Sequence, residues 1–120
     1  MNRLISIKEL SPSTVTRSRG SEAYTELLDY LKSGEPVEID LRGQELISMS
    51  FLDEMVIKLS SAGLLDKVTF LVTNETIYQR LAQVAAIRCA RIFYKPGEGE
   101  ERKIIESKPV PDLELRKARS

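Results

Sequence analysis

The sequence predicts an α/β fold with a mixed, mostly parallel sheet of roughly four to five strands and about three helices. Short segments with strand-like apolar patterns are followed repeatedly by segments whose apolar residues recur at helical spacing. This alternation is typical of parallel strands joined by right-handed helical crossovers. The length of 120 residues suits one domain with one hydrophobic core.

The N-terminal part is predicted to form two short strands and a helix. Residues 4–10 are mainly apolar, and residues 14–16 include β-branched side chains that suit a pleated sheet. A helix follows, with Ser21 as its N-cap and Gly34 at its end. Its predicted buried stripe consists of Tyr24, Leu27, Leu28 and Leu31.

The middle of the chain is predicted to contain a strand and a second helix. Residues 37–41 alternate apolar and acidic side chains, which indicates a strand. The second helix is expected to begin at Ser50, because Asp53 follows at the spacing of a capping box, and to end at Gly63. Its predicted apolar face consists of Leu52, Met55, Val56, Leu59 and Ala62.

The last predicted elements are a buried strand at residues 68–72, a helix capped by Asn74 and a strand at residues 92–94. These elements place the domain at residues 1–95. Residues 96–120 hold twelve charged residues and three prolines. We expect this segment to be a charged, mobile tail, in which Ile104 and Ile105 offer one further edge strand.

Composition disfavours several classes of function. The chain has no histidine, which removes histidine-based catalysis and nearly every zinc site. Its single cysteine, Cys89, permits no intrachain disulfide, and the net charge of zero disfavours a strongly basic nucleic-acid binder. The sequence contains no glycine-rich phosphate loop and no apolar run long enough to span a membrane. We therefore expect a cytoplasmic protein that is not an enzyme and needs no cofactor or metal.

Charge is distributed unevenly along the chain. Residues 22–66 carry ten acidic and three basic side chains, and basic segments flank them. This distribution predicts an acidic face that would attract a basic partner surface.

Two groups of charged residues are candidates for a site. Arg17 and Arg19 flank the start of the first helix, and Arg88 lies at the end of the third, so these arginines are either solvated helix ends or a contact for an anion or an acidic partner. Asp53 and Glu54 are neighbours on a helix and point about 100° apart, so they cannot share a proton. They either complement the helix N-terminus or contact a partner.

Residues 38–54 resemble the STAS domain, the fold of anti-sigma factor antagonists. In that family, a strand ending in Asp-Leu-Ser-Gly leads through a short apolar loop into Asp-Ser-Ser-Gly-Leu at a helix start. Asp40, Leu41 and Gly43 match the first motif, and Ser50 matches the second serine of the other. The chain departs from the second motif at Ser48, Met49 and Phe51.

A closer resemblance is to a prokaryotic family of STAS-like domains of unknown function. Its pattern is matched by Arg-Ser-Arg-Gly at residues 17–20, by Asp40, by Ser-Phe-x-Asp-Glu at residues 50–54 and by Arg88, and it extends over residues 14–94. Members of this family are often encoded beside, or fused to, histidine-kinase-like ATPase domains. The resemblance thus implies a STAS-like fold and a partner-switching or regulatory role.

We interpret the chain as a non-catalytic regulatory module that docks a histidine-kinase-like ATPase or a sigma-regulator protein. A small-anion or nucleotide-binding domain using Arg17, Arg19 and Arg88 is one alternative, and a structural homo-oligomerisation module is another. Membrane and nucleic-acid partners are not expected. The candidate partner-binding or regulatory residues are Asp40, Ser48, Ser50, Phe51, Asp53 and Glu54.

Overall fold

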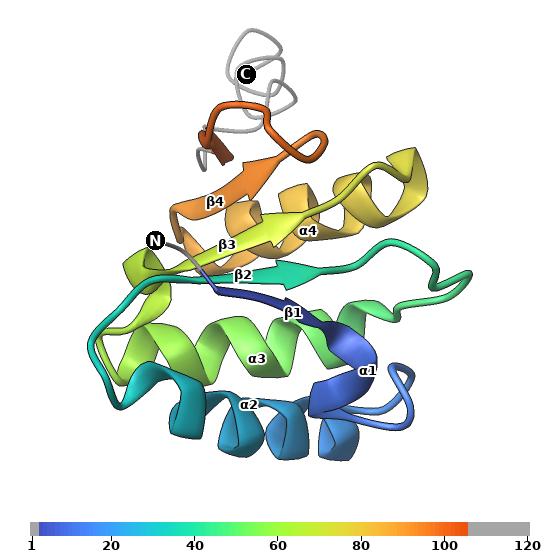
Figure 1. Cartoon of the computed structure of the whole chain (residues 1–120). Helices are drawn as coiled ribbons and strands as arrows, with labels where there is room; N and C mark the ends of the chain where they lie inside the picture. The colour runs from blue at the N-terminus through green and yellow to red at the C-terminus, as the bar shows by residue number, and fades with distance from the viewer. Residues whose placement is uncertain (1–2, 106–120) are drawn as a thin grey trace, which may run out of the picture.

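Strands and helices alternate along the chain in the computed structural model, which describes residues 3–105 (Figure 1). The mixed α/β class with a mostly parallel sheet is confirmed. The described residues form four helices rather than about three, and one additional 3-10 turn. The elements are β1 (Arg3–Ser6), α1 (Ile7–Leu10), α2 (Arg17–Leu31), β2 (Val37–Asp40), α3 (Met49–Ser61), η1 (Leu65–Lys67), β3 (Val68–Leu71), α4 (Glu75–Arg88), β4 (Ile92–Lys95) and β5 (Lys103–Ile105).

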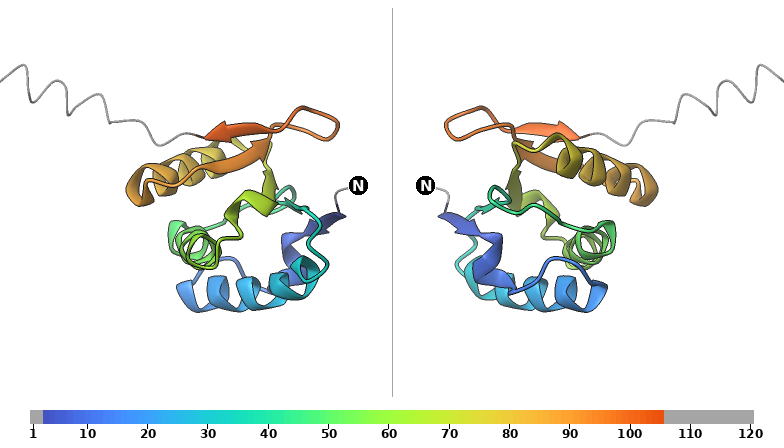
Figure 2. Two further views of the ribbon diagram at one scale, coloured as in Figure 1. Left: turned by 90° about the vertical axis from the view of Figure 1, so that its left-hand side faces the viewer. Right: turned by 90° about the vertical axis from the view of Figure 1, so that its right-hand side faces the viewer.

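The five strands lie in the sheet in the same order as in the chain. Strands β1 to β4 run parallel, and β5 pairs antiparallel with β4. Each parallel connection therefore advances the sheet by one position in the same direction. Because such crossovers are right-handed, they place their helices on the same face. Figure 2 shows α2, α3 and α4 on one side of the sheet.

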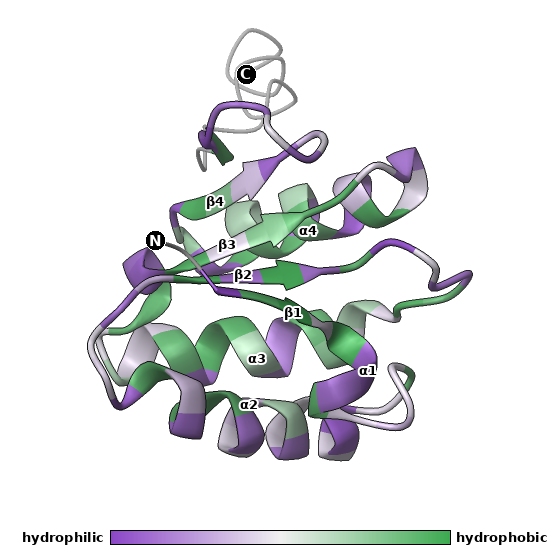
Figure 3. Ribbon diagram, viewed as in Figure 1, coloured by the Kyte–Doolittle hydropathy of each residue, from purple (hydrophilic) through white to green (hydrophobic). Residues whose placement is uncertain are grey.

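The core lies between this face and the helices. Ile5, Ile39 and Phe70 are register partners on three adjacent strands, and all three are buried. Figure 3 shows largely apolar strands and a polar outer side on α2. Helix α3 is the most deeply packed helix, with five fully buried apolar side chains: Phe51, Leu52, Met55, Val56 and Leu59.

The structure differs from the prediction that residues 4–10 form a single short strand. Strand β1 ends at Ser6, and a short helix follows over Ile7–Leu10. Ser6 accepts a hydrogen bond from the Lys8 N–H, while the Glu9 carboxylate accepts one from the Ser6 N–H at 2.9 Å. This Ser-x-x-Glu capping box starts a helical turn inside an apolar segment.

The predicted strand at residues 14–16 is wrong, and so is Ser21 as the cap of the next helix. Thr14 lies in a loop, where its hydroxyl donates to the Leu46 carbonyl oxygen at 2.6 Å. Helix α2 begins five residues earlier than predicted, because Thr16 rather than Ser21 is its cap: Thr16 Oγ1 accepts from the Arg19 N–H at 3.1 Å. Its fully buried positions are Gly20, Ala23, Leu27 and Leu31.

Of the caps predicted for the two later helices, the cap of α4 is confirmed and the cap of α3 is wrong. Helix α3 is capped by Ser48 rather than Ser50: Ser48 Oγ accepts from the Phe51 N–H at 3.1 Å. Helix α4 has the predicted cap, since Asn74 Oδ1 accepts from the Ile77 N–H at 3.1 Å.

The start of the predicted tail contributes to the sheet. The edge strand predicted at Ile104 and Ile105 is present as β5, in which Ile105 pairs with Ile92 and is buried. Arg102 lies over the ring of Phe93, with its guanidinium carbon 3.5 Å from the ring centroid. The rest of the predicted mobile tail, residues 106–120, lies outside the described residues. Among residues 3–105, no helix is both long and apolar enough to cross a membrane.

Candidate functional site

The first turns of α3 lie where α2 begins and α4 ends. Side chains from the three helices line a hollow of about 250 Å³, which we call the α3 hollow. Its lining consists of Arg17 from α2, Met49, Ser50 and Asp53 from α3, and Ile87 and Arg88 from α4.

Asp53 is the charged centre of the α3 hollow. Arg88 donates to both of its oxygens, from Nε to Oδ1 and from Nη2 to Oδ2, each at 2.8 Å. Arg17 Nη1 lies 3.0 Å from Oδ2. The hydrogen bonds from Arg88, together with those from Arg17, hold the pKa of the Asp53 carboxyl below its usual value although burial acts in the opposite direction. Asp53 is therefore an ionised carboxylate at neutral pH.

Glu54 joins the same ionic cluster. Arg17 Nη1 donates to its Oε1 at 3.1 Å, and Lys58 Nζ lies 3.6 Å from Oε2 one turn further along α3. Both acidic residues that the sequence offered as a partner contact thus have basic partners inside the molecule. Pairing with basic side chains offsets the desolvation cost of burying two adjacent carboxylates.

Gly20 explains how Arg17 reaches α3. A Cβ atom at this position would lie 2.5 Å from the carbonyl oxygen of Phe51 and 3.0 Å from the Cβ of Glu54. Only a residue without a side chain allows α2 and α3 to approach so closely. Arg17 lies one helical turn before Gly20 and is thereby brought beside Asp53 and Glu54. The available sequence signal was Gly20 itself, which the predicted helix start at Ser21 left outside the helix.

The two serines before and within α3 have different environments. Ser48 Oγ donates to the Val15 carbonyl oxygen in addition to capping the helix, so its hydroxyl serves the fold. Ser50 is exposed and lines the α3 hollow. Phe51 is fully buried in the core, which corrects its prediction as a surface contact.

Asp40 lies apart from this cluster, at the end of β2. It accepts hydrogen bonds from the backbone N–H, Nε and Nη2 of Arg42, each at 2.9 Å, and these bonds lower the pKa of its carboxyl. Arg42 also donates to Glu98 at 2.7 Å. Asp40 therefore fixes the loop after β2 and does not line the α3 hollow.

The predicted arginine cluster forms only in part. Arg17 and Arg88 meet at Asp53, whereas Arg19 pairs with Glu22 at 2.9 Å on the outer side of α2. Arg19 is not among the residues that line the hollow.

Apolar side chains also line the α3 hollow. Ile87 is well exposed and Met49 is half-buried, and both line the hollow itself. Val15 and Leu46 are also exposed. Their two segments are joined by the hydrogen bond from Thr14 Oγ1 to the Leu46 carbonyl oxygen, and Ser48 Oγ donates to the Val15 carbonyl oxygen. Protein interfaces typically combine an apolar centre with a polar rim, and the exposed Ile87 beside paired charges offers both kinds of contact.

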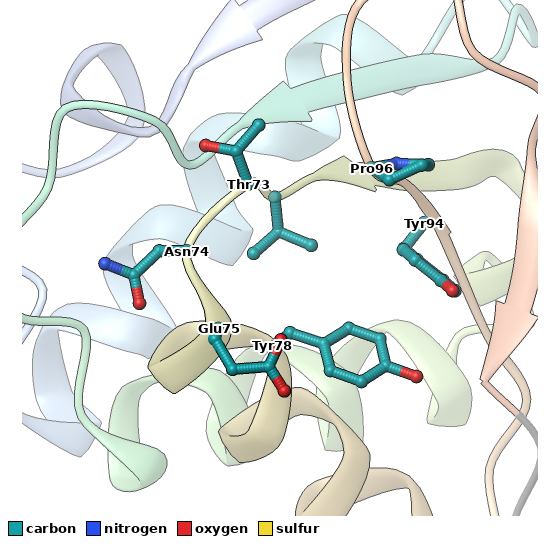
Figure 4. A pocket seen from close by; sticks show the side chains of 7 residues that line it. Thr73, Asn74, Glu75, Tyr78, Tyr94 and Pro96 are labelled. Atoms are coloured by element: carbon teal, nitrogen blue, oxygen red, sulfur yellow. The ribbon is translucent and has the colours of Figure 1, made fainter.

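A second hollow, of about 260 Å³, lies at the C-terminal ends of β3 and β4 (Figure 4). Tyr78 and Tyr94 form one wall, with ring centroids 5.1 Å apart. The Asn74 side chain caps its own helix, and the Glu75 carboxylate accepts a hydrogen bond from Gln79, so these two side chains already have partners. In the part of the chain that the structure describes, no group of three acidic, cysteine or histidine residues could hold a metal ion.

Comparison with known proteins gives one match. A family model described as a STAS-like domain of unknown function (DUF4325) matches residues 20–78. The match runs from Gly20 through the whole of α3 to the first turn of α4, and it includes Asp40 and residues 50–54. Arg17 and Arg88 lie just outside it on either side. No curated protein and no solved structure matches the chain.

Proposed function

Because residues 20–78 are a STAS-like domain of unknown function, we propose that the chain is a non-catalytic regulatory module that binds a protein partner through the α3 hollow. The resemblance described above suggests the kind of partner, a histidine-kinase-like ATPase or a sigma-regulator protein. The geometry suggests the surface, since α3 begins there and two other helices contribute to it.

The observation that carries this proposal is the exposure of Ile87. Its side chain is 65% exposed, although it lines a hollow together with Met49 and the paired charges. Fully burying an isoleucine side chain contributes roughly 1.5–3 kcal/mol. A partner that covers Ile87 and Met49 would therefore gain the apolar contact that typically anchors an interface.

The test is affinity capture of the full chain and its bound proteins from the native host, with identification by mass spectrometry. Ile87→Asp should abolish recovery of the partner, because it places a charge in the apolar contact. Leu4→Asp is the matched control, since Leu4 is 43% exposed but lies on β1 at the edge of the sheet. Equal recovery with both variants would show that the α3 hollow is not the docking surface.

Ser50 is the residue at which a modification could regulate this surface. It is exposed in the first turn of α3 and shares the hollow with Arg17 and Arg88. A phosphoryl group there would accept hydrogen bonds from the two guanidinium groups and occupy the donors that face a partner. Under this proposal Ser50→Asp changes partner capture whereas Ser50→Ala does not.

The meeting of Arg17 and Arg88 in one hollow also favours a second function, the binding of a small anion or nucleotide. A bound ligand raises the Tm by mass action. Thermal shift with inorganic phosphate and with nucleotides tests this function, and an unchanged Tm with all of them would remove it.

A further inference from the structure

The α3 hollow combines exposed guanidinium groups with carboxylates that are largely buried. We propose that the hollow binds an acidic segment of a partner protein, in which a carboxylate lies next to apolar side chains. This inference rests on the proposed function, because it names the chemistry of the partner at the same surface.

The acidic residues of the hollow lie beneath its basic ones. The side chains of Asp53 and Glu54 are only 11% and 18% exposed, whereas those of Arg17 and Arg88 are 49% and 43% exposed. An approaching partner therefore meets guanidinium groups first. The local excess of acidic residues in the sequence does not produce an acidic surface here, because it is covered.

The charges of the cluster do not cancel. Three basic groups, those of Arg17, Lys58 and Arg88, face two carboxylates, those of Asp53 and Glu54. Within residues 3–105, no further carboxylate lies within ion-pair distance of either arginine. One added carboxylate would bring the cluster to neutrality.

Both arginines keep hydrogen-bond donors for such a carboxylate. Arg88 uses Nε and Nη2 for Asp53, and Arg17 uses Nη1 for Asp53 and Glu54. A guanidinium group has five N–H donors, so each arginine can bind a second acceptor without releasing the first. The internal carboxylates also hold the two guanidinium groups in place, which lowers the entropy cost of binding a partner.

The apolar side chains define the rest of the partner segment. Ile87 directly precedes Arg88, and Met49 lines the same hollow. A segment whose apolar residue covers Ile87 therefore brings its neighbouring residues beside the Arg88 guanidinium. Carboxylates at those neighbouring positions would form charge-assisted hydrogen bonds, whereas lysine or arginine would meet like charge.

The experiment selects peptides from a random library displayed on phage, with the full chain as the target. We expect the selected peptides to combine acidic and apolar residues and to lose binding to Ile87→Asp. A synthetic copy of one selected peptide should bind about tenfold more tightly than the same peptide with each Asp and Glu replaced by Asn and Gln. Fluorescence anisotropy measures both affinities, and added salt should weaken only the acidic peptide.

Two arginine variants separate a local effect from a change of net charge. Arg17→Gln should weaken the acidic peptide about tenfold, whereas Arg19→Gln should change its affinity less than about twofold. Arg17→Gln keeps the two hydrogen bonds between Arg88 and Asp53, so the variant should fold, and thermal unfolding checks this. Selection of basic or uncharged peptides, the absence of any selected peptide, or equal effects of the two variants would overturn the inference.

The outcomes also separate this inference from the proposed function. If Ile87→Asp abolishes capture of the host partner but the charge variants have no effect on it, the docking surface stands and the acidic segment is wrong. If acidic peptides bind through Arg17 but Ile87→Asp leaves host capture unchanged, the proposed function is wrong.

Discussion

Arg88 at the end of α4 binds Asp53 in α3 through two parallel hydrogen bonds of 2.8 Å, although the two residues are 35 positions apart in the chain. Asp53 lies almost entirely beneath the surface, and Arg17 contacts it from α2. One carboxylate thus connects the three helices that pack on the sheet. Substitutions at these residues therefore test both the stability of the fold and the candidate docking surface.

Replacing Arg88 should destabilise the fold. Arg88→Met keeps much of the apolar stem but leaves Asp53 with Arg17 as its remaining partner, so the Tm should fall. Arg88→Lys should give an intermediate Tm, because a lysine cannot make the two-point contact. Arg91→Met is the control for loss of an exposed arginine in the same region. Equal Tm values for Arg88→Met and Arg91→Met would show that the pair does not stabilise the protein.

Acid should remove the stabilisation that Asp53 and Asp40 provide. The pKa of each carboxyl is lowered in the folded protein from the ordinary 3.8, by Arg88 and by Arg42 respectively. The unfolded chain therefore binds protons first, and the stabilisation is present above the unfolded pKa and lost as the pH falls through the folded pKa. Urea unfolding between about pH 6 and about pH 2 measures this dependence. Asp53→Asn should give a flatter profile, and a profile as steep as that of the unmodified chain would contradict the prediction.

Gly20→Ala should separate α2 from α3. The added methyl group would lie 2.5 Å from the Phe51 carbonyl oxygen, which is backbone and cannot rotate away. Overpacking of this kind costs about 1–3 kcal/mol in the free energy of unfolding. Ser18→Ala, at an exposed position on the same helix, should have little effect in the same chemical denaturation experiment. A Gly20→Ala variant as stable as Ser18→Ala would mean that the helices can shift apart without loss.

Ser48 and Ser50 should respond differently to the same substitution. Ser48→Ala removes the α3 cap and the hydrogen bond to the Val15 carbonyl, so it should cost about 1–2 kcal/mol. Ser50→Ala should leave the free energy of unfolding almost unchanged, because this side chain is exposed. The reverse order of stabilities would restore Ser50 as the cap.

Local signals predicted most of the fold, because strands and caps depend on neighbouring residues. The alternation at residues 37–41 and the cap at Asn74 needed no knowledge of distant contacts. Ser48 and Ser50 are equally good caps by type, and the capping-box spacing to Asp53 favoured the wrong one. Ser48 differs from Ser50 in a distant contact: its hydroxyl donates a hydrogen bond to the carbonyl oxygen of Val15, which lies 33 positions away in the chain.

The geometry of the candidate site was harder to predict from the sequence, because it too depends on contacts between residues that are distant in the chain. Asp53, Glu54, Arg17 and Arg88 were all candidates from the sequence, but the acidic and the basic residues were treated as two separate groups. Their pairing depends on the close approach of α2 and α3 at Gly20, which is a property of the packed helices. Charge counted along the chain cannot show that the side chains of Arg17 and Arg88 are more exposed than those of the two carboxylates that they contact.

The order of the strands in the sheet affects how the protein can be synthesised. Within residues 3–105, each strand after β1 pairs with the strand that precedes it in the chain, and none must be inserted between two strands that are already paired. Each unit of helix and strand can thus pack onto an existing sheet edge as it leaves the ribosome, without waiting for residues still to be translated. Loop closures stay short, which favours rapid folding and limits the time for which an unfinished sheet edge is open to aggregation.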